Sequence, residues 1–119
     1  MTPTTQPNGF VTQLKHNQVF VFGSNLDGNH AGGAARQALE FGAKPGIGVG
    51  LAGQTYAIPT MHGHDRLYHY AQEFMHFASH HPDVEFLLTP VGTGIAGFPV
   101  EDIELAFNGL PDNVIKVGW

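Results

Sequence analysis

The sequence predicts a three-layer α/β/α domain with a mostly parallel or mixed β-sheet. Short apolar runs of strand length alternate with segments of helical character, which is the pattern of a sheet covered by helices on both faces. The strand runs are continuously apolar, as in strands buried on both sides. The length of 119 residues fits one domain. We therefore interpret residues 1–17 as an N-terminal arm and lead-in, with 1–9 loose, and residues 18–119 as the single domain.

The first strand of the predicted sheet is Val19–Phe22, an apolar run that ends in Gly23-Ser24-Asn25. Leu26–His30 follows as a loop. Gly32–Phe41 is rich in alanine and predicts a short helix. Gly42 stands where glycine commonly terminates helices.

The middle of the chain holds a glycine-dense loop, a strand and a long helix. Pro45–Gly53 is the loop, and Thr55–Pro59 is the second strand. Asp65 is a residue type that caps helix N-termini, and the helix expected after it runs to about His81, because Pro82 follows.

The last part of the chain repeats the order of strand, glycine loop, helix and strand. These elements are Glu85–Val91, Gly92–Pro99, Val100–Phe107 and Val114–Val117. The helix has acidic side chains in its first turns, which suits the positive end of the helix dipole. Ligands of such sheets lie outside the carboxyl ends of the strands, so we expect a site formed by Gly23–Gly33 and Gly92–Phe98.

Composition and charge exclude several classes of function. The chain has no cysteine, which excludes a disulfide scaffold, a cysteine-ligated zinc module and a cysteine nucleophile. Five Lys and Arg against ten Asp and Glu give a formal net charge of −5, so nucleic-acid binding is not expected. No apolar run has membrane-spanning length, and the N-terminus lacks the features of a signal peptide. We therefore expect a cytoplasmic protein without membrane contact.

The loop Gly92–Gly97 is the most informative stretch of the sequence. It follows an apolar strand and precedes a helix, and its glycines let a ligand approach the backbone closely. Successive backbone N–H groups can surround an anion such as a diphosphate with few cationic side chains. The alternative is a tight turn between strand and helix.

A second candidate is the strand end Gly23-Ser24-Asn25 with the following Gly28, Gly32 and Gly33. The carboxamide of Asn25 can donate and accept hydrogen bonds with ribose hydroxyls, although asparagine also suits turns that bind nothing. Gly48–Gly53 matches the spacing G-x-G-x-x-G but follows a helix and precedes a strand. We interpret it as a structural loop, because a dinucleotide-binding motif must follow a strand and open a helix.

The eight histidines raise the question of a metal site. Four residues of the long helix, at helical spacing, form one stripe: His69, Glu73, His76 and His80. The apolar stripe of the same helix lies roughly 130° away, so the histidine stripe is predicted to face solvent. No metal is expected, although His76 and His80 could bind nickel or zinc adventitiously.

Other titratable residues lie near the predicted site. His30 is in the first glycine loop and is the histidine we most expect near a ligand. His62 and His64 follow the second strand and reach the same edge if that strand is parallel. Asp27 could activate a water, although a loop aspartate is more often a turn residue.

With both loops placed, residues 18–118 resemble a macro domain, the ADP-ribose-binding fold, in the short form of bacteria and phages. The family pattern joins an apolar strand ending in Asn, a Gly-rich loop and a helix, here Val19–Asn25 and Gly28–Gly33. Its later strand leads into a Thr-Gly-x-x-Gly-aromatic-Pro loop, here within Thr89–Pro99.

The resemblance implies binding of ADP-ribose or a related NAD-derived nucleotide. Asn25 would hold the distal ribose, Gly32 and Gly33 would lie along the diphosphate and that ribose, and Phe98 would pack on the ribose side. The phosphate loop would consist of Gly92, Thr93, Gly94, Ile95, Ala96 and Gly97.

Two positions depart from the family pattern. No Asp or Glu precedes the first strand, so nothing matches the aspartate that reads adenine in larger members. Hydrolytic members commonly carry an aspartate after the glycine run, where this chain has Ala34, which favours binding over hydrolysis.

Three functions remain open on these observations. The first is a binding module without cofactor or metal that captures, and so sequesters, a small nucleotide of the ADP-ribose class, in the host cytoplasm if a phage encodes it. The second is a hydrolase of ADP-ribose derivatives, with Asn25, His30 or Asp27 as catalytic candidates. The third is an interaction domain with an unused pocket. A homo-oligomer is compatible with each, and the surroundings of Trp119 are its candidate interface, because a terminal tryptophan is large and apolar.

Overall fold

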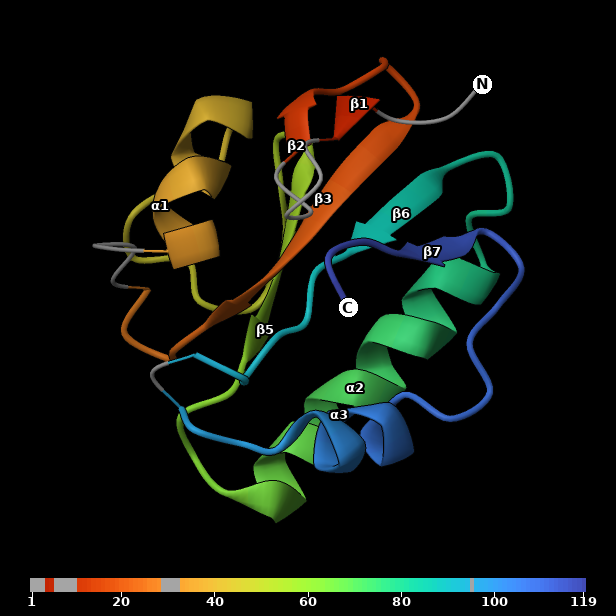
Figure 1. The fold of residues 1–119 in the computed structure, drawn as a ribbon. Coiled ribbons are helices and arrows are strands. Elements are labelled where there is room, and N and C mark those ends of the chain that lie inside the picture. The colour runs from red at the N-terminus through yellow and green to blue at the C-terminus, as the bar shows by residue number, and fades with distance from the viewer. Residues whose placement is uncertain (1–3, 6–10, 29–32, 95) are drawn as a thin grey trace.

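The computed structural model describes residues 4–5, 11–28, 33–94 and 96–119. A five-stranded sheet of order β4-β5-β3-β6-β7 lies between α1 on one face and α2 and α3 on the other (Figure 1). The predicted α/β/α class is therefore confirmed. The elements are β1 (Thr4–Thr5), β2 (Val11–Gln13), β3 (Gln18–Ser24), α1 (Gly33–Ala38), β4 (Gly50–Ala52), β5 (Thr55–Pro59), α2 (His64–Ser79), β6 (Glu85–Leu88), α3 (Val100–Ala106) and β7 (Val114–Lys116).

Strand β3 is the middle of the sheet and pairs in parallel with both β5 and β6. Val21 of β3 lies between Tyr56 of β5 and Leu88 of β6. The far strand β7 is parallel to β6, and β4 is antiparallel to β5, so the sheet is mixed. The interior position of β3 accounts for its continuous apolar run, since both of its faces are covered.

Alternate residues of β3 face two separate cores. Val19 and Val21 face α2 and α3 and pack in one cluster with Phe74 of α2. Phe20 and Phe22 face the opposite side and cluster with residues that include Ala38 of α1. The two clusters fix which side each helix covers, because a strand presents successive side chains to opposite faces.

Helix α2 begins and ends differently from the sequence prediction. Its N-cap is Gly63, with a φ of 87°, and Asp65 lies inside the first turn, so the predicted Asp65 cap is wrong. The helix ends at Ser79, two residues before the predicted His81. Around the end of this helix, Asn113 Nδ2 donates to the backbone carbonyls of Ala78 at 3.0 Å, His81 at 2.9 Å and Val84 at 2.9 Å. This side chain ties the end of α2 to the lead-in of β7.

Short strands form in two places where the sequence predicts loops. Thr4–Thr5 of the arm predicted to be loose pairs with Val11–Gln13 as the small antiparallel sheet β1-β2. Gly50–Ala52, inside the predicted glycine loop, forms β4 and pairs with Ala57–Thr55 of β5. Both pairings are between strands close in the chain, and the short strands carry little apolar signal.

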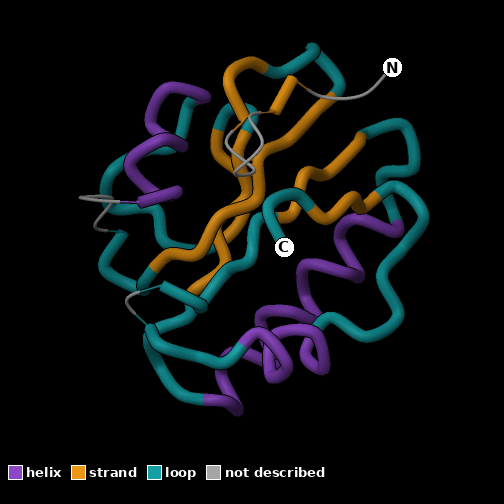
Figure 2. The backbone as a smooth tube through the Cα atoms, in the orientation of Figure 1, coloured by secondary structure: helices purple, strands orange, loops and turns teal. Residues whose placement is uncertain are grey.

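The remaining elements agree with the predictions to within a few residues. The predicted first helix is α1 followed by a turn of 3₁₀-helix at Leu39–Phe41, and Gly42 ends it with a φ of 107°. Strand β6 ends at Leu88, three residues before the predicted Val91. Figure 2 shows the loops that join these strands and helices. No helix within the described ranges has the length and apolar character to span a membrane.

Candidate functional site at the carboxyl edge of the sheet

The connections that follow β3, β5 and β6 converge on one edge of the sheet, because these three strands are parallel. Gly23, near the end of β3, lies against the other two connections. A Cβ atom on Gly23 would stand 3.3 Å from the backbone nitrogen of Gly92 and 3.4 Å from Oγ1 of Thr60. The two glycine loops singled out in the sequence therefore lie side by side, and Thr60, directly after β5, lies against both Gly23 and Gly92.

The loop Gly92–Phe98 is folded back on itself. Phe98 N–H donates to Gly92 O at 2.9 Å, and Gly97 N–H donates to Gly94 O at 3.0 Å. The Thr93 hydroxyl donates to Pro90 O at 2.7 Å. Gly92 has a φ of 80°, and a Cβ there would press on Phe98 and Ile103 at 3.1 Å. Glycine at position 92 is therefore required by the turn itself.

The outer side of the same loop is open. Among the described residues, apart from the direct neighbours in the chain, no atom lies within 4 Å of the position that a Cβ on Gly94 or on Gly97 would take. The backbone N–H groups of Gly94 and Ala96 donate to no atom of residues 4–5, 11–28, 33–94 or 96–119. Two backbone N–H groups of this loop thus have no acceptor among the described residues, and successive backbone N–H groups can bind an anion.

The loop after β3 is built as a compact turn. Gly28 N–H donates to Asn25 O at 3.0 Å, and Gly46 N–H donates to Gly28 O at 2.9 Å. The buried Ser24 hydroxyl donates to Gly48 O at 2.7 Å. We call residues 25–28 the Asn25 turn. Ser24 serves this turn rather than the open surface, since its hydroxyl is occupied and buried.

Gly48 packs closely against the Asn25 turn. A Cβ on Gly48 would lie 1.8 Å from the backbone oxygen of Asn25. The G-x-G-x-x-G run Gly48–Gly53 opens no helix, because it continues into β4. Its interpretation as a structural loop agrees with this geometry.

His62 and His64 reach the edge as well, because β5 is parallel to β3. Nε2 of His62 accepts the backbone N–H of Leu26, in the Asn25 turn, at 3.2 Å. Nε2 of His64 lies 2.9 Å from Oδ2 of Asp102, and its ring packs edge-on against Phe98 with centroids 4.8 Å apart. These contacts were not predicted, although the sequence does place both histidines on this edge.

Several predicted site residues fall outside the part that the structure describes. His30, Gly32 and Ile95 are among them, and Gly33 is described by its backbone as the first residue of α1. Asp27 is exposed within the Asn25 turn and makes no ion pair or side-chain hydrogen bond with the described residues.

The histidine stripe of α2 is exposed, as predicted. His69 pairs with Glu73 at 3.2 Å, and the rings of His76 and His80 lie with centroids 4.4 Å apart. Across the described ranges no three metal-ligating side chains come together.

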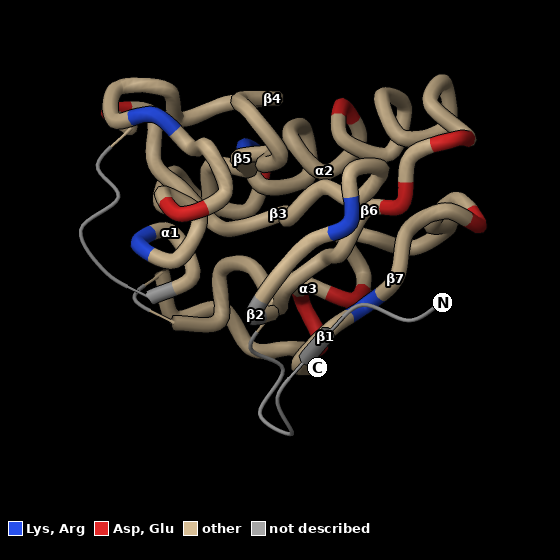
Figure 3. The backbone as a smooth tube through the Cα atoms, turned by 90° about the horizontal axis from the view of Figure 1, so that it is seen from above, with Lys and Arg blue, Asp and Glu red and all other residues tan. Residues whose placement is uncertain are grey.

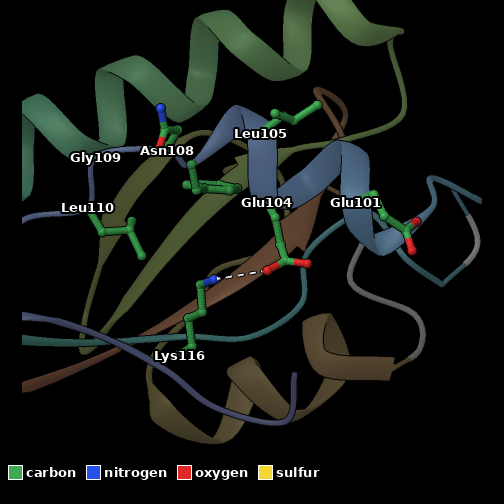
Figure 4. A pocket seen from close by; sticks show the side chains of 8 residues that line it. Glu101, Glu104, Leu105, Asn108, Gly109, Leu110 and Lys116 are labelled. Carbon is green, nitrogen blue, oxygen red and sulfur yellow. Dashed lines mark ion pairs between the residues drawn. The ribbon is translucent and has the colours of Figure 1, made fainter.

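A hollow of about 720 Å³ lies elsewhere, between α3 and β7 (Figure 4). Its lining residue Lys116 reaches Glu104 at 3.5 Å and lies over the ring of Trp119 at 4.7 Å. Glu101 adds a further negative charge, so the hollow does not suit an anion. Trp119 itself is half-buried and donates from its indole nitrogen to Leu88 O at 2.7 Å, which holds the chain end on the sheet. The expected interface near Trp119 stays a prediction.

Lysine and arginine residues are scattered along the chain and do not cluster at the carboxyl edge of the sheet (Figure 3). Affinity for an anion at that edge would therefore depend on backbone and neutral donors. No family model matches the chain, and no curated protein or solved structure is significantly similar to it. The functional conclusion accordingly depends on the geometry of the edge and on the sequence motifs.

Proposed function

We propose that this protein binds ADP-ribose or a related NAD-derived nucleotide at the carboxyl edge of its sheet. The observation that carries the proposal is the pair of backbone N–H donors at Gly94 and Ala96 beside an open surface. A diphosphate would accept from these donors, which need no side-chain cation. The low count of five Lys and Arg in the whole chain is consistent with this mode of binding.

The neighbouring residues supply the polar and apolar contacts that a ribose next to a diphosphate requires. Asn25 lies in the turn beside the glycine loop, and its carboxamide has both donors and an acceptor for hydroxyl groups. Phe98, partly exposed and braced by His64, offers the face of a ring. The proposed ligand therefore lies across the two loops, with the diphosphate on Gly92–Gly97.

Binding without turnover is the form of the proposal that the residues favour. Ala34, at the position where hydrolytic macro domains carry an aspartate, has no acid–base chemistry. Asp27 is exposed and has no polar partner among the described residues that would orient it. Such a protein would hold the nucleotide and thereby remove it from solution.

Calorimetric titration with ADP-ribose, followed by chromatography of the recovered ligand, tests the proposal. We expect micromolar or tighter binding and return of intact ADP-ribose. No heat at millimolar ligand, together with an unchanged melting temperature, would refute it, since a ligand at 100 times its Kd adds about 2.7 kcal/mol of stability. Recovery of cleaved ligand would instead identify the hydrolase.

Substitutions in the loop locate the site. Gly94→Val places a branched side chain on the open surface and is expected to abolish binding while leaving the melting temperature near that of the wild type. Gly97→Ala and Gly109→Ala form a matched pair, because both glycines have positive φ and open space around the added Cβ. Both variants carry the same backbone strain, but only Gly97→Ala is expected to weaken binding. Equal affinity of all three variants for ADP-ribose would show that the diphosphate does not bind at this loop.

A further inference from the structure

The segment His62-Gly63-His64 joins all three connections at the carboxyl edge. It belongs to the connection between β5 and α2. His62 binds the Asn25 turn through Leu26, and His64 binds the first turn of α3 through Asp102. We call these residues the His62–His64 segment. Neither histidine itself contacts the nucleotide in the proposed mode of binding, although His64 packs against Phe98.

The segment is itself anchored to the core. Gly63 O accepts the backbone N–H of Leu67, which is fully buried in α2. Gly63 has a φ of 87°, a conformation that side chains other than glycine rarely adopt. The two imidazoles therefore extend from a backbone whose position is fixed by the helix.

The two histidines must carry their protons on different nitrogens. A backbone N–H can only donate, so Nε2 of His62 is the acceptor of the Leu26 bond and a neutral His62 is protonated on Nδ1. The carboxylate of Asp102 accepts, so Nε2 of His64 carries a proton. Protonation of the second nitrogen therefore has opposite consequences at the two residues.

Full protonation breaks the contact of His62 and strengthens that of His64. An imidazolium has donors at both nitrogens and no acceptor, so it cannot bind the Leu26 N–H. At His64 the added charge strengthens the attraction to Asp102. Among the described residues, the charged or titratable groups on the segments that contact the His62–His64 segment are Asp27 in the turn that His62 binds, His64, Asp65 and Arg66 after it in the chain, and Asp102 on α3, which contacts His64. The proposed phosphate loop, residues 92–97, contains no titratable side chain.

We propose that His62 is a positioning residue that holds the Asn25 turn against the ligand site only while its imidazole is neutral. This inference depends on the proposed function, because the turn is assigned there to the ribose. Acidification then releases the turn, and affinity for ADP-ribose falls. A histidine that contacted the diphosphate directly would produce the opposite sign, since its positive charge would raise affinity at acidic pH.

Titration with ADP-ribose at about pH 8 and about pH 5.5 tests the sign. We expect affinity to fall about fivefold to tenfold at the lower pH, the value of one hydrogen bond. His62→Gln keeps an acceptor near the position of Nε2 and cannot be protonated, so it should retain the neutral-pH affinity and lose the fall. His62→Asn is too short to reach Leu26 and should bind weakly at both values.

Two controls separate His62 from the other histidines. His64→Gln still donates to Asp102 and should keep the fall with pH. His76→Gln changes an exposed histidine on the same helix, away from the edge, and should also keep it. Affinity that rises or stays constant on acidification of the wild type, or a fall that survives in His62→Gln, would overturn the role of His62.

A measurement without ligand distinguishes failure of this inference from failure of the proposed function. The nitrogen chemical shifts of His62 report its tautomer, and hydrogen exchange of the Leu26 amide reports the bond. We expect the Nδ1–H tautomer at about pH 8 and a protection factor for Leu26 that collapses at about pH 5.5. If the protein shows this behaviour but does not bind ADP-ribose, the proposed ligand is refuted, while the pH-dependent contact between His62 and the Asn25 turn is retained. An unprotected Leu26 amide at neutral pH would refute the positioning contact.

Discussion

Gly48→Ala should distort the Asn25 turn without touching the open surface of the proposed site. The added Cβ would lie 1.8 Å from the backbone oxygen of Asn25 and 2.9 Å from its carbonyl carbon. Ordinary contact requires 3.4 Å or more, so the turn must retreat by well over one ångström. Both obstructing atoms are backbone, so no side chain can rotate to make room.

The cost follows from the bonds that such a retreat breaks. The turn is held by Ser24 Oγ to Gly48 O at 2.7 Å, Gly28 N–H to Asn25 O at 3.0 Å and Gly46 N–H to Gly28 O at 2.9 Å. Loss of two of these bonds, at about 1 kcal/mol each, together with overpacking of about 1–2 kcal/mol, lowers the free energy of unfolding by about 3 kcal/mol. For a domain of this size that is a fall of roughly 10 °C in melting temperature.

Thermal unfolding followed by circular dichroism measures this change, and titration with ADP-ribose at a temperature where the variant is folded measures the site. The control is Gly94→Ala, whose added methyl group meets nothing within 4 Å and should leave the melting temperature within a few degrees of the wild type. A Gly48→Ala protein with the wild-type melting temperature would contradict the reasoning. If it also failed to bind, the G-x-G-x-x-G run would have to be reconsidered as a ligand loop.

Three further predictions concern other parts of the molecule. Burial, with a smaller contribution from the charge of Glu73, raises the pKa of Tyr56 from 10.0 to about 12. As the pH rises, the unfolded chain therefore loses the hydroxyl proton of Tyr56 before the folded chain does. The free energy of unfolding, measured by urea titration, should fall by about 1.4 kcal/mol per pH unit between pH 10 and 12. This fall should be absent in Tyr56→Phe. Asn113→Ala removes the donor to three carbonyls and should cost about 2 kcal/mol in urea unfolding, whereas Asn108→Ala, at an exposed position, should cost little. His76→Ala combined with His80→Ala should change neither the melting temperature nor calorimetric binding of ADP-ribose by a measurable amount, since both side chains are exposed on α2; loss of binding would place that stripe in the site.

The elements that the sequence predicts well are those whose burial is complete. Strand β5 was predicted with its observed bounds, because every residue of Thr55–Pro59 is buried. The faces of α2 were also predicted, since Leu67, Ala71 and Phe74 recur at helical spacing and are fully buried. Long apolar patterns of this kind express the core directly.

The elements that the sequence missed carry little apolar signal of their own. Strand β4 contains only Gly50, Leu51 and Ala52, and Leu51 is 52% exposed, so no burial pattern marks it. It forms because it pairs with β5. The N-cap of α2 was missed for a related reason: Asp65 has the usual side chain for a cap, but Gly63 has the backbone conformation that turns the chain after β5.

The sequence predicts which loops meet at the carboxyl edge of the sheet, but not which atoms meet there. Parallel strands imply a common edge, so the proximity of Gly23 to Gly92 follows from the fold class. The bond between His62 and Leu26 joins residues 36 positions apart and depends on the exact exit of the chain from β5. No spacing rule contains that information, so the sequence does not predict this bond.

The glycines of this chain illustrate why motif spacing alone misplaces a ligand. Gly48 and Gly53 satisfy G-x-G-x-x-G, yet a Cβ on either would meet backbone within 3 Å, at Asn25 and at Gly42. Glycine at these two positions lets two backbone segments pack closely against each other. Gly94 has an ordinary backbone conformation and open space, so packing gives no reason for glycine there. A glycine that the fold does not need is the one most readily explained by a ligand, and it lies beside the two N–H groups that have no acceptor among the described residues.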